Sequence, residues 1–161
     1  MLTLFVDASF SHQQGKAGWG AWAIHDSWDR GRTFGAKMFG ITNNTSAELI
    51  ALGEAVRMLQ GRQWWPRDVV MLQSDSHHAL SALSANLPNT RTKNHKKDSV
   101  AFSNKSPALL PKEEEAIEVI KSATFGFQVY LRHIKGHTGV NKGRNWVNQQ
   151  CDRIARQYMR A

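Results

Sequence analysis

The stretch Thr45-Ser46-Ala47-Glu48 marks the point at which the hydrophobic period of the sequence changes, and it decides the class of fold. It matches the capping box that opens a helix, in which a hydroxyl residue precedes a glutamate by three positions. Apolar residues then recur at the spacing of one helix face: Leu49, Leu52, Val56 and Leu59. Gly61 is placed to end the helix. We therefore predict a long amphipathic helix that begins near residue 45.

Upstream of this helix the sequence has the period of strands. Residues 2–7 are mostly apolar and end at Asp7, and residues 17–25 alternate small side chains with Trp19 and Trp22. Residues 33–41 are a third and weaker candidate. Because the connections between them are short, we expect these three strands to form an antiparallel meander.

Downstream of the helix, strands and helices alternate. We expect strands at 69–72 and 127–134, helices after Asp75, at 112–123 and from about Trp146, and a basic loop or irregular arm at about 88–111. The order βββαβααβα predicts an α/β fold with a mixed five-stranded sheet, antiparallel and then parallel, flanked by helices. The length of 161 residues suits a single domain spanning 1–161.

The amino-acid composition limits the classes of function that the protein can have. The formal net charge is +8, from 21 Lys and Arg against 13 Asp and Glu, which favours a polyanionic partner such as nucleic acid. No apolar run approaches the roughly 18 residues of a membrane span, and the N-terminal strand lacks the basic region of a signal peptide. The lone Cys151 excludes an internal disulfide and argues against a cysteine zinc site, so we expect a cytoplasmic protein.

Four acidic residues stand where they could form one carboxylate cluster. Asp7 closes an apolar strand and Asp75 closes another, while Glu48 and Asp152 lie in the first and last long helices. Carboxylates that converge repel one another and require a cation, and oxygen-only ligands select Mg²⁺ or Mn²⁺. Each acid also has a simpler interpretation: Glu48 as part of the capping box, Asp75 as a helix cap, and Asp152 as a helix-surface acid.

The chain resembles a type 1 ribonuclease H over nearly its whole length. Six short segments carry the resemblance in order and spacing: Phe5-Val6-Asp7-Ala8-Ser9, Gly18-Trp19-Gly20-Ala21-Trp22, Thr42-Asn43-Asn44 through Glu48-Leu49, Ser74-Asp75-Ser76, Lys135-Gly136-His137-Thr138-Gly139, and Cys151-Asp152 with Ala155-Arg156.

The resemblance implies a ribonuclease H-like fold and a set of site residues. Asp7, Glu48, Asp75 and Asp152 resemble the family's four metal-binding carboxylates, which would hold two Mg²⁺ ions, with Mn²⁺ as a substitute. His137 resembles the family's mobile histidine, which assists the reaction by proton transfer. The positions expected to contact the hybrid near these carboxylates are Ser9, Thr42, Asn43 and Asn44.

The function implied is an endoribonuclease that hydrolyses the RNA strand of RNA–DNA hybrids as a monomer, without a small-molecule cofactor. Two alternatives stay open: a DNA nuclease of the same superfamily, either a junction resolvase or an exonuclease, and a non-catalytic nucleic-acid-binding module. Lysines of the basic arm are expected to bind phosphates: Lys93, Lys96, Lys97 and Lys105. Four departures from the family stand out. Ala8 replaces a common glycine, His77 replaces a familiar glutamine, the arm contains no tryptophan, and the loop from His137 to Asp152 is longer than in compact members of the family.

Overall fold

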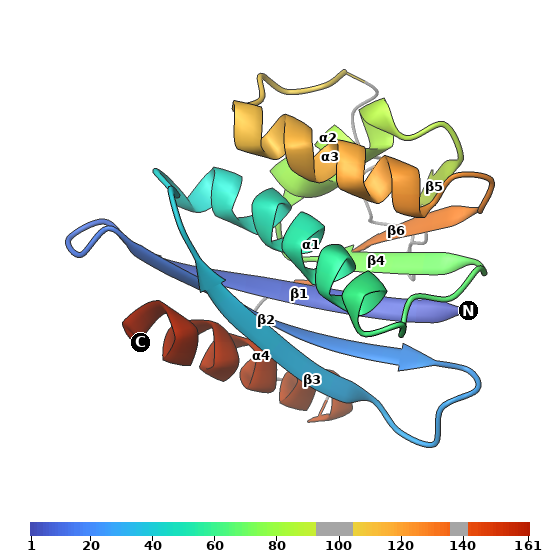
Figure 1. Ribbon diagram of the computed structural model, residues 1–161, viewed down its shortest axis with the longest axis horizontal. Helices are drawn as coiled ribbons and strands as arrows, with labels where there is room; N and C mark the ends of the chain where they lie inside the picture. The colour runs from blue at the N-terminus through green and yellow to red at the C-terminus, as the bar shows by residue number, and fades with distance from the viewer. Residues whose placement is uncertain (93–104, 136–141) are drawn as a thin grey trace.

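The computed structural model describes residues 1–92, 105–135 and 142–161, the last range with side chains from residue 146 onward. Within these ranges one mixed sheet of six strands is covered by four helices (Figure 1). The elements in chain order are β1 (Leu2–Ser11), β2 (Lys16–His25), β3 (Arg32–Met38), α1 (Asn44–Gly61), β4 (Val70–Ser74), α2 (His77–Asn86), β5 (Thr90–Thr92), α3 (Pro111–Ala123), β6 (Val129–His133) and α4 (Lys142–Arg160).

The strands lie in the order β3-β2-β1-β4-β6-β5. β1 to β3 pair antiparallel, whereas β4, β5 and β6 are joined to the sheet by parallel pairings. The predicted α/β class, with an antiparallel meander followed by parallel strands, is confirmed. The expected strand number of five is corrected to six, because Thr90–Thr92 of the predicted arm pairs with residues 129–131 of β6. Three residues are too few to reveal a strand period in a sequence.

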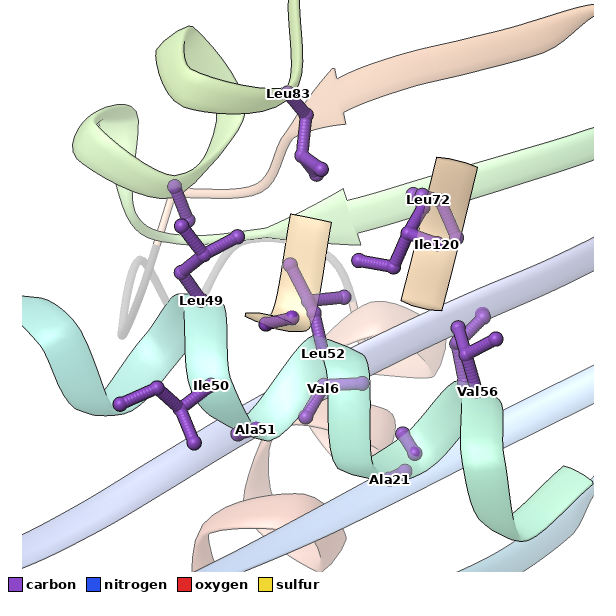
Figure 2. Close-up of a cluster of buried hydrophobic side chains, with 14 of the residues drawn as sticks. Val6, Ala21, Leu49, Ile50, Ala51, Leu52, Val56, Leu72, Leu83 and Ile120 are labelled. Carbon is purple, nitrogen blue, oxygen red and sulfur yellow. The ribbon is translucent and has the colours of Figure 1, made fainter. Parts of the chain in front are cut away.

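The main core lies between the sheet and α1, α2 and α3. The predicted apolar face of α1 is buried, with Leu49, Leu52 and Leu59 fully inaccessible to solvent. Figure 2 shows Leu49 and Leu52 in one cluster with Val6 and Leu72 from the sheet and Ile120 from α3. Burial of this face holds α1, and with it Glu48, against the middle of β1.

Helix α4 covers the opposite face of the sheet, over β1, β2 and β3 (Figure 1). Gly18 and Gly20 of β2 allow this approach, because a Cβ at either position would overlap backbone atoms of α4. Trp19, between them, points the other way and is fully buried in the main core. In the segment Gly18-Trp19-Gly20 the two glycines leave one face of β2 free of side chains for α4, and Trp19 fills the core on the other face.

Several element boundaries differ from the expectations. β1 and β2 extend to Ser11 and Lys16, which shortens the expected turn. α1 is capped by Asn43, whose side chain accepts a hydrogen bond from the Ser46 N–H at 2.7 Å, and not by Thr45. α4 begins at Lys142, one turn before Trp146. None of the helices in the described ranges is long and apolar enough to cross a membrane.

Candidate active site

The strand register places Asp7 and Asp75 side by side. β1 and β4 are adjacent and parallel, and their last paired residues are Phe5 and Gln73. Asp7 and Asp75 each lie two residues beyond that pair, so they stand at the same level on neighbouring strands. Ser76, and not Asp75, caps α2 by accepting a hydrogen bond from the Ala79 N–H at 3.1 Å. The carboxylate of Asp75 is therefore not the cap of that helix.

Glu48 reaches the same place from α1. Its Oε1 accepts a hydrogen bond from the Ala8 N–H at 3.3 Å, next to Asp7 in the chain. Because Asn43 caps the helix, Glu48 is not the capping-box glutamate that the sequence allowed. Its second carboxylate oxygen, Oε2, is buried and has no hydrogen-bond partner in the structure.

Asp7, Glu48 and Asp75 form a compact group in which one oxygen from each lies within 4.8 Å of the others. Burial, followed by the charges of Asp75 and Asp152, raises the pKa of Asp7 to about 7. Burial, followed by Asp7 and Asp75, raises the pKa of Glu48 well above its usual range. The charge of Arg156 acts in the opposite direction on Asp7, but its effect is smaller than that of burial and the neighbouring carboxylates.

Asp152 approaches from α4 on the other face of the sheet. Its carboxylate is partly exposed and pairs with Arg156, four residues on, at 3.3 Å from Nε to Oδ2. Its charge acts on Asp7, although it stands outside the three-carboxylate group. All four predicted acids therefore come from different parts of the chain to the middle of β1, next to the end of β4, with Asp152 the most peripheral.

The donor chemistry of this group suits a hard divalent cation. All the ligands offered are carboxylate oxygens, which favour Mg²⁺, Ca²⁺ or Mn²⁺ over softer metals. A buried, unpartnered oxygen such as Glu48 Oε2 is costly unless a cation or donor meets it. A cation at this point would satisfy Oε2 and offset the repulsion that raises the pKa of Asp7.

Comparisons with known proteins identify the family of the chain. The family model described as RNase H matches residues 1–160. The chain belongs to the ribonuclease H family. The predicted enzyme class, a ribonuclease H hydrolase, is confirmed with it. The chain is also 27% identical over 159 residues to a ribonuclease H of Syntrophomonas wolfei subsp. wolfei, an alignment that covers 96% of this chain and 93% of that protein.

Solved ribonucleases H share the fold. RNase H1 of the archaeon Halobacterium salinarum NRC-1 matches with a TM-score of 0.62 at 15% identity, over 99% of this chain and 97% of that one. LC11-RNase H1, solved in complex with an RNA/DNA hybrid, matches with a TM-score of 0.63 at 16% identity, with the same coverage. At these identities the likeness supports the fold of this ribonuclease H.

The residues predicted to contact nucleic acid fall into two groups. Asn44 and Thr42 are exposed at the start of α1, Asn43 is partly buried as its cap, and Ser9 lies two residues beyond Asp7 with its Oγ 3.2 Å from Met159 Sδ. Lys105 is exposed. The remaining predicted residues lie outside the described ranges: Lys93, Lys96, Lys97 and His137.

A histidine pair beside the ribonuclease H carboxylates was not predicted. His133, at the end of β6, donates from Nε2 to the backbone carbonyl of Asp75 at 3.0 Å. Its ring stacks on His77 with centroids 3.8 Å apart. Burial and the neighbouring His133 lower the pKa of His77. The sequence signalled only the unusual residue at 77, because no local pattern reveals that β6 lies beside β4.

Proposed function

We propose that the chain is an endoribonuclease that hydrolyses the RNA strand of RNA–DNA hybrids, with two Mg²⁺ ions, or Mn²⁺ in their place, held by Asp7, Glu48, Asp75 and Asp152. The observation that carries the proposal is the buried Oε2 of Glu48, which has no hydrogen-bond partner among the described residues, within a group of three carboxylates whose oxygens lie within 4.8 Å of one another. When bound, two such ions supply electrostatic stabilisation of the phosphate and activation of water.

The protein's own residues have distinct roles in this proposal. Asp7 and Asp75 are the central ligands, because the β1–β4 register fixes them at the same level. Glu48 is held in place by the Ala8 N–H, and Asp152 by Arg156. His137 would exchange a proton with the water or the leaving group.

Hybrid specificity is supported by polar groups around the carboxylates. Asn44 and Thr42 are exposed at the N-terminal end of α1, the helix that carries Glu48. Asn43 and Asn44 are proposed to contact the minor groove, where the 2′-hydroxyl distinguishes RNA from DNA, and Thr42 is proposed to contact a phosphate of the DNA strand. Ser9 and the lysines at 93, 96, 97 and 105 extend the proposed contact surface. We further propose that the protein acts as a cytoplasmic monomer without a small-molecule cofactor.

A cleavage assay separates the candidate activities. Purified protein is incubated in Mg²⁺ with a labelled RNA–DNA hybrid, a DNA duplex and single strands. Cleavage of the hybrid RNA strand alone supports the proposal, whereas cleavage of the DNA duplex would identify a DNA nuclease of the same superfamily. Binding without cleavage of any substrate would identify a non-catalytic module.

The metal assignment is tested with one variant and a matched control. Asp7→Asn should abolish cleavage in Mg²⁺ while the protein stays folded, and it should remove the rise in Tm that Mg²⁺ gives the unmodified protein. The control Asp29→Asn makes the same change at an exposed position outside the carboxylate group. Cleavage by Asp7→Asn at a near-normal rate would exclude Asp7 as a metal ligand.

A further inference from the structure

Arg132 is a cation in the sheet with no counter-charge among the residues that the structure describes. Arg132 lies in β6 and is partly buried. It makes no hydrogen bond, ion pair or ring contact with a described residue. Burial lowers the pKa of its guanidinium. A partly desolvated charge without a partner costs stability, and proteins retain such groups mainly where a ligand completes them.

The strand register places Arg132 on the same face of the sheet as Asp7. Arg132 pairs with Gln73 of β4, and Gln73 pairs with Phe5 of β1. Directly paired residues project from one face, and so do residues two apart along a strand. Asp7 is two residues beyond Phe5, so the row Phe5, Gln73, Arg132 lies on the face of Asp7. Phe5 packs with Val147 and Cys151 of α4, which confirms that this is the α4 face.

The spacing suits a neighbouring phosphate. Two interstrand steps of about 4.8 Å and two residues of about 3.3 Å put the Cα atoms of Arg132 and Asp7 roughly 12 Å apart. At an axial rise of about 3.4 Å per nucleotide in each strand of a duplex, this span corresponds to three to four nucleotides. Among the described residues, α4 packs mainly on β1, β2 and β3 and not on β6.

We propose that Arg132 is a phosphate-binding residue that holds the backbone of a hybrid bound at the carboxylate group, a few nucleotides from the reacting phosphodiester. The guanidinium can bind a phosphate through two parallel hydrogen bonds. The phosphate would also provide the negative counter-charge that no described residue provides. The inference rests on the proposed function, since it takes the hybrid to be bound at Asp7.

The test measures hybrid binding as a function of salt. Fluorescence anisotropy of a labelled hybrid is followed from 50 to 200 mM KCl, with all variants built on Asp7→Asn to prevent cleavage. Arg132→Gln should weaken binding about tenfold, the loss of one charge-assisted contact. It should also reduce the slope of log Kd against log salt by about 0.9, the value for one phosphate contact on B-form duplex. Arg67→Gln, an exposed residue between α1 and β4, should change neither quantity.

Two further measurements distinguish binding from a structural role. Arg132→Lys keeps the charge and should keep the slope while losing part of the affinity, since an ammonium cannot bind bidentately. Arg132→Gln should leave Tm unchanged or raised, because it removes an uncompensated charge. A lowered Tm with an unchanged slope would make Arg132 a structural residue and overturn the inference.

The two proposals fail in different ways. Efficient, RNA-strand-specific cleavage by the unmodified protein, together with an unchanged slope for Arg132→Gln, would overturn this inference alone. If the protein neither cleaves nor binds the hybrid, the proposed function and the inference are both overturned.

Discussion

Gly20 is paired with Asp7 across the β1–β2 ladder, and α4 crosses the sheet directly over it. A Cβ at residue 20 would overlap the backbone oxygen of Cys151, the residue before Asp152. The absence of a side chain at Gly20 therefore sets how closely Asp152 approaches Asp7. Gly20 thus lets α4 pack closely on β2, and this packing brings Asp152 near the other carboxylates.

Gly20→Ala should displace α4 from the sheet and draw Asp152 away from Asp7. Because the clash is with backbone, which cannot rotate aside, we expect a loss of about 1–3 kcal/mol in the free energy of unfolding. The Mg²⁺ concentration for half-maximal cleavage should also rise. Urea unfolding and a Mg²⁺ titration of activity measure the two effects.

The matched control is Gly61→Ala at the end of α1. A Cβ there meets nothing within 4 Å, so stability should be unchanged or slightly higher. Equal free energies of unfolding for the two variants would show that the packing of α4 does not depend on the absence of a side chain at Gly20.

The raised pKa of Asp7 predicts an unusual dependence of stability on pH in the absence of metal. Asp7 binds its proton more tightly in the folded state, with a pKa of about 7, than at its ordinary value of 3.8. This contribution is fully present below about pH 4 and is lost as the pH rises through 7. Glu48 acts in the same direction. The loss should be on the order of 1–4 kcal/mol.

Unfolding in EDTA at pH 5 and pH 8 measures this loss. The unmodified protein should lose more stability over that interval than Asp7→Asn, which cannot ionise at residue 7. Mg²⁺ at pH 8 should restore stability to the unmodified protein, because a cation favours the ionised carboxylates. Parallel pH profiles for the two proteins would mean that folding does not raise the pKa of Asp7.

His133 should fix the position of Asp75 through its hydrogen bond to the Asp75 backbone carbonyl. His133→Phe keeps an aromatic ring to stack on His77 but removes the donor to the Asp75 carbonyl. Residues that orient metal ligands typically alter metal affinity 10- to 100-fold, so we expect the Mg²⁺ requirement to rise by about tenfold. The KM for hybrid at saturating Mg²⁺ should not change. A changed KM with an unaltered Mg²⁺ requirement would instead make His133 part of the substrate surface.

Glu113 holds the N-terminal ends of α2 and α3 together. It is almost fully buried, it accepts from His78 Nε2 at 2.6 Å, and its other oxygen accepts from the Leu110 N–H at 3.0 Å. Glu113→Ala should lower the free energy of unfolding by about 2–4 kcal/mol, since it leaves both donors without their acceptor. Glu118→Ala, on the exposed side of the same helix, should cost under about 0.5 kcal/mol by the same urea measurement. Similar losses for both variants would exclude a special role for Glu113.

The elements with strong periods could be predicted from the sequence, and β5 could not. The apolar spacing of α1 and the first strand follow from local patterns and both are present, although the strand continues past Asp7 to Ser11. Thr90–Thr92 is a strand only because β6 offers it a partner, which is a tertiary effect. The sequence predicted Thr45 as the cap of α1 because Thr45 and Glu48 have the spacing of a capping box. In the structure Asn43 is the cap, and the Glu48 side chain accepts a hydrogen bond from the Ala8 N–H.

The carboxylate group could be assembled from the sequence, but its immediate surroundings could not. Acids at the ends of apolar strands are locally unusual, so Asp7 and Asp75 are visible without a structure. His133 and Arg132 carry no such signal, since alternating polar residues are ordinary in a strand with one buried face. Their importance depends on β6 lying next to β4, which follows from the order of strands in the sheet.

The prediction for His137 depends on its chemistry, since it lies outside the described ranges. It is expected to transfer a proton, because an imidazole titrates near neutral pH and the segment Lys135-Gly136-His137-Thr138-Gly139 joins β6 to the helix that carries Asp152. His137→Ala should lower kcat about 10²- to 10⁴-fold, the usual contribution of general acid–base catalysis. Hybrid affinity and the Mg²⁺ requirement should stay nearly unchanged. Single-turnover cleavage with a parallel Mg²⁺ titration separates these quantities. A large loss of Mg²⁺ affinity would make His137 a ligand, and an unchanged kcat would leave the reaction to the carboxylates and the ions they hold.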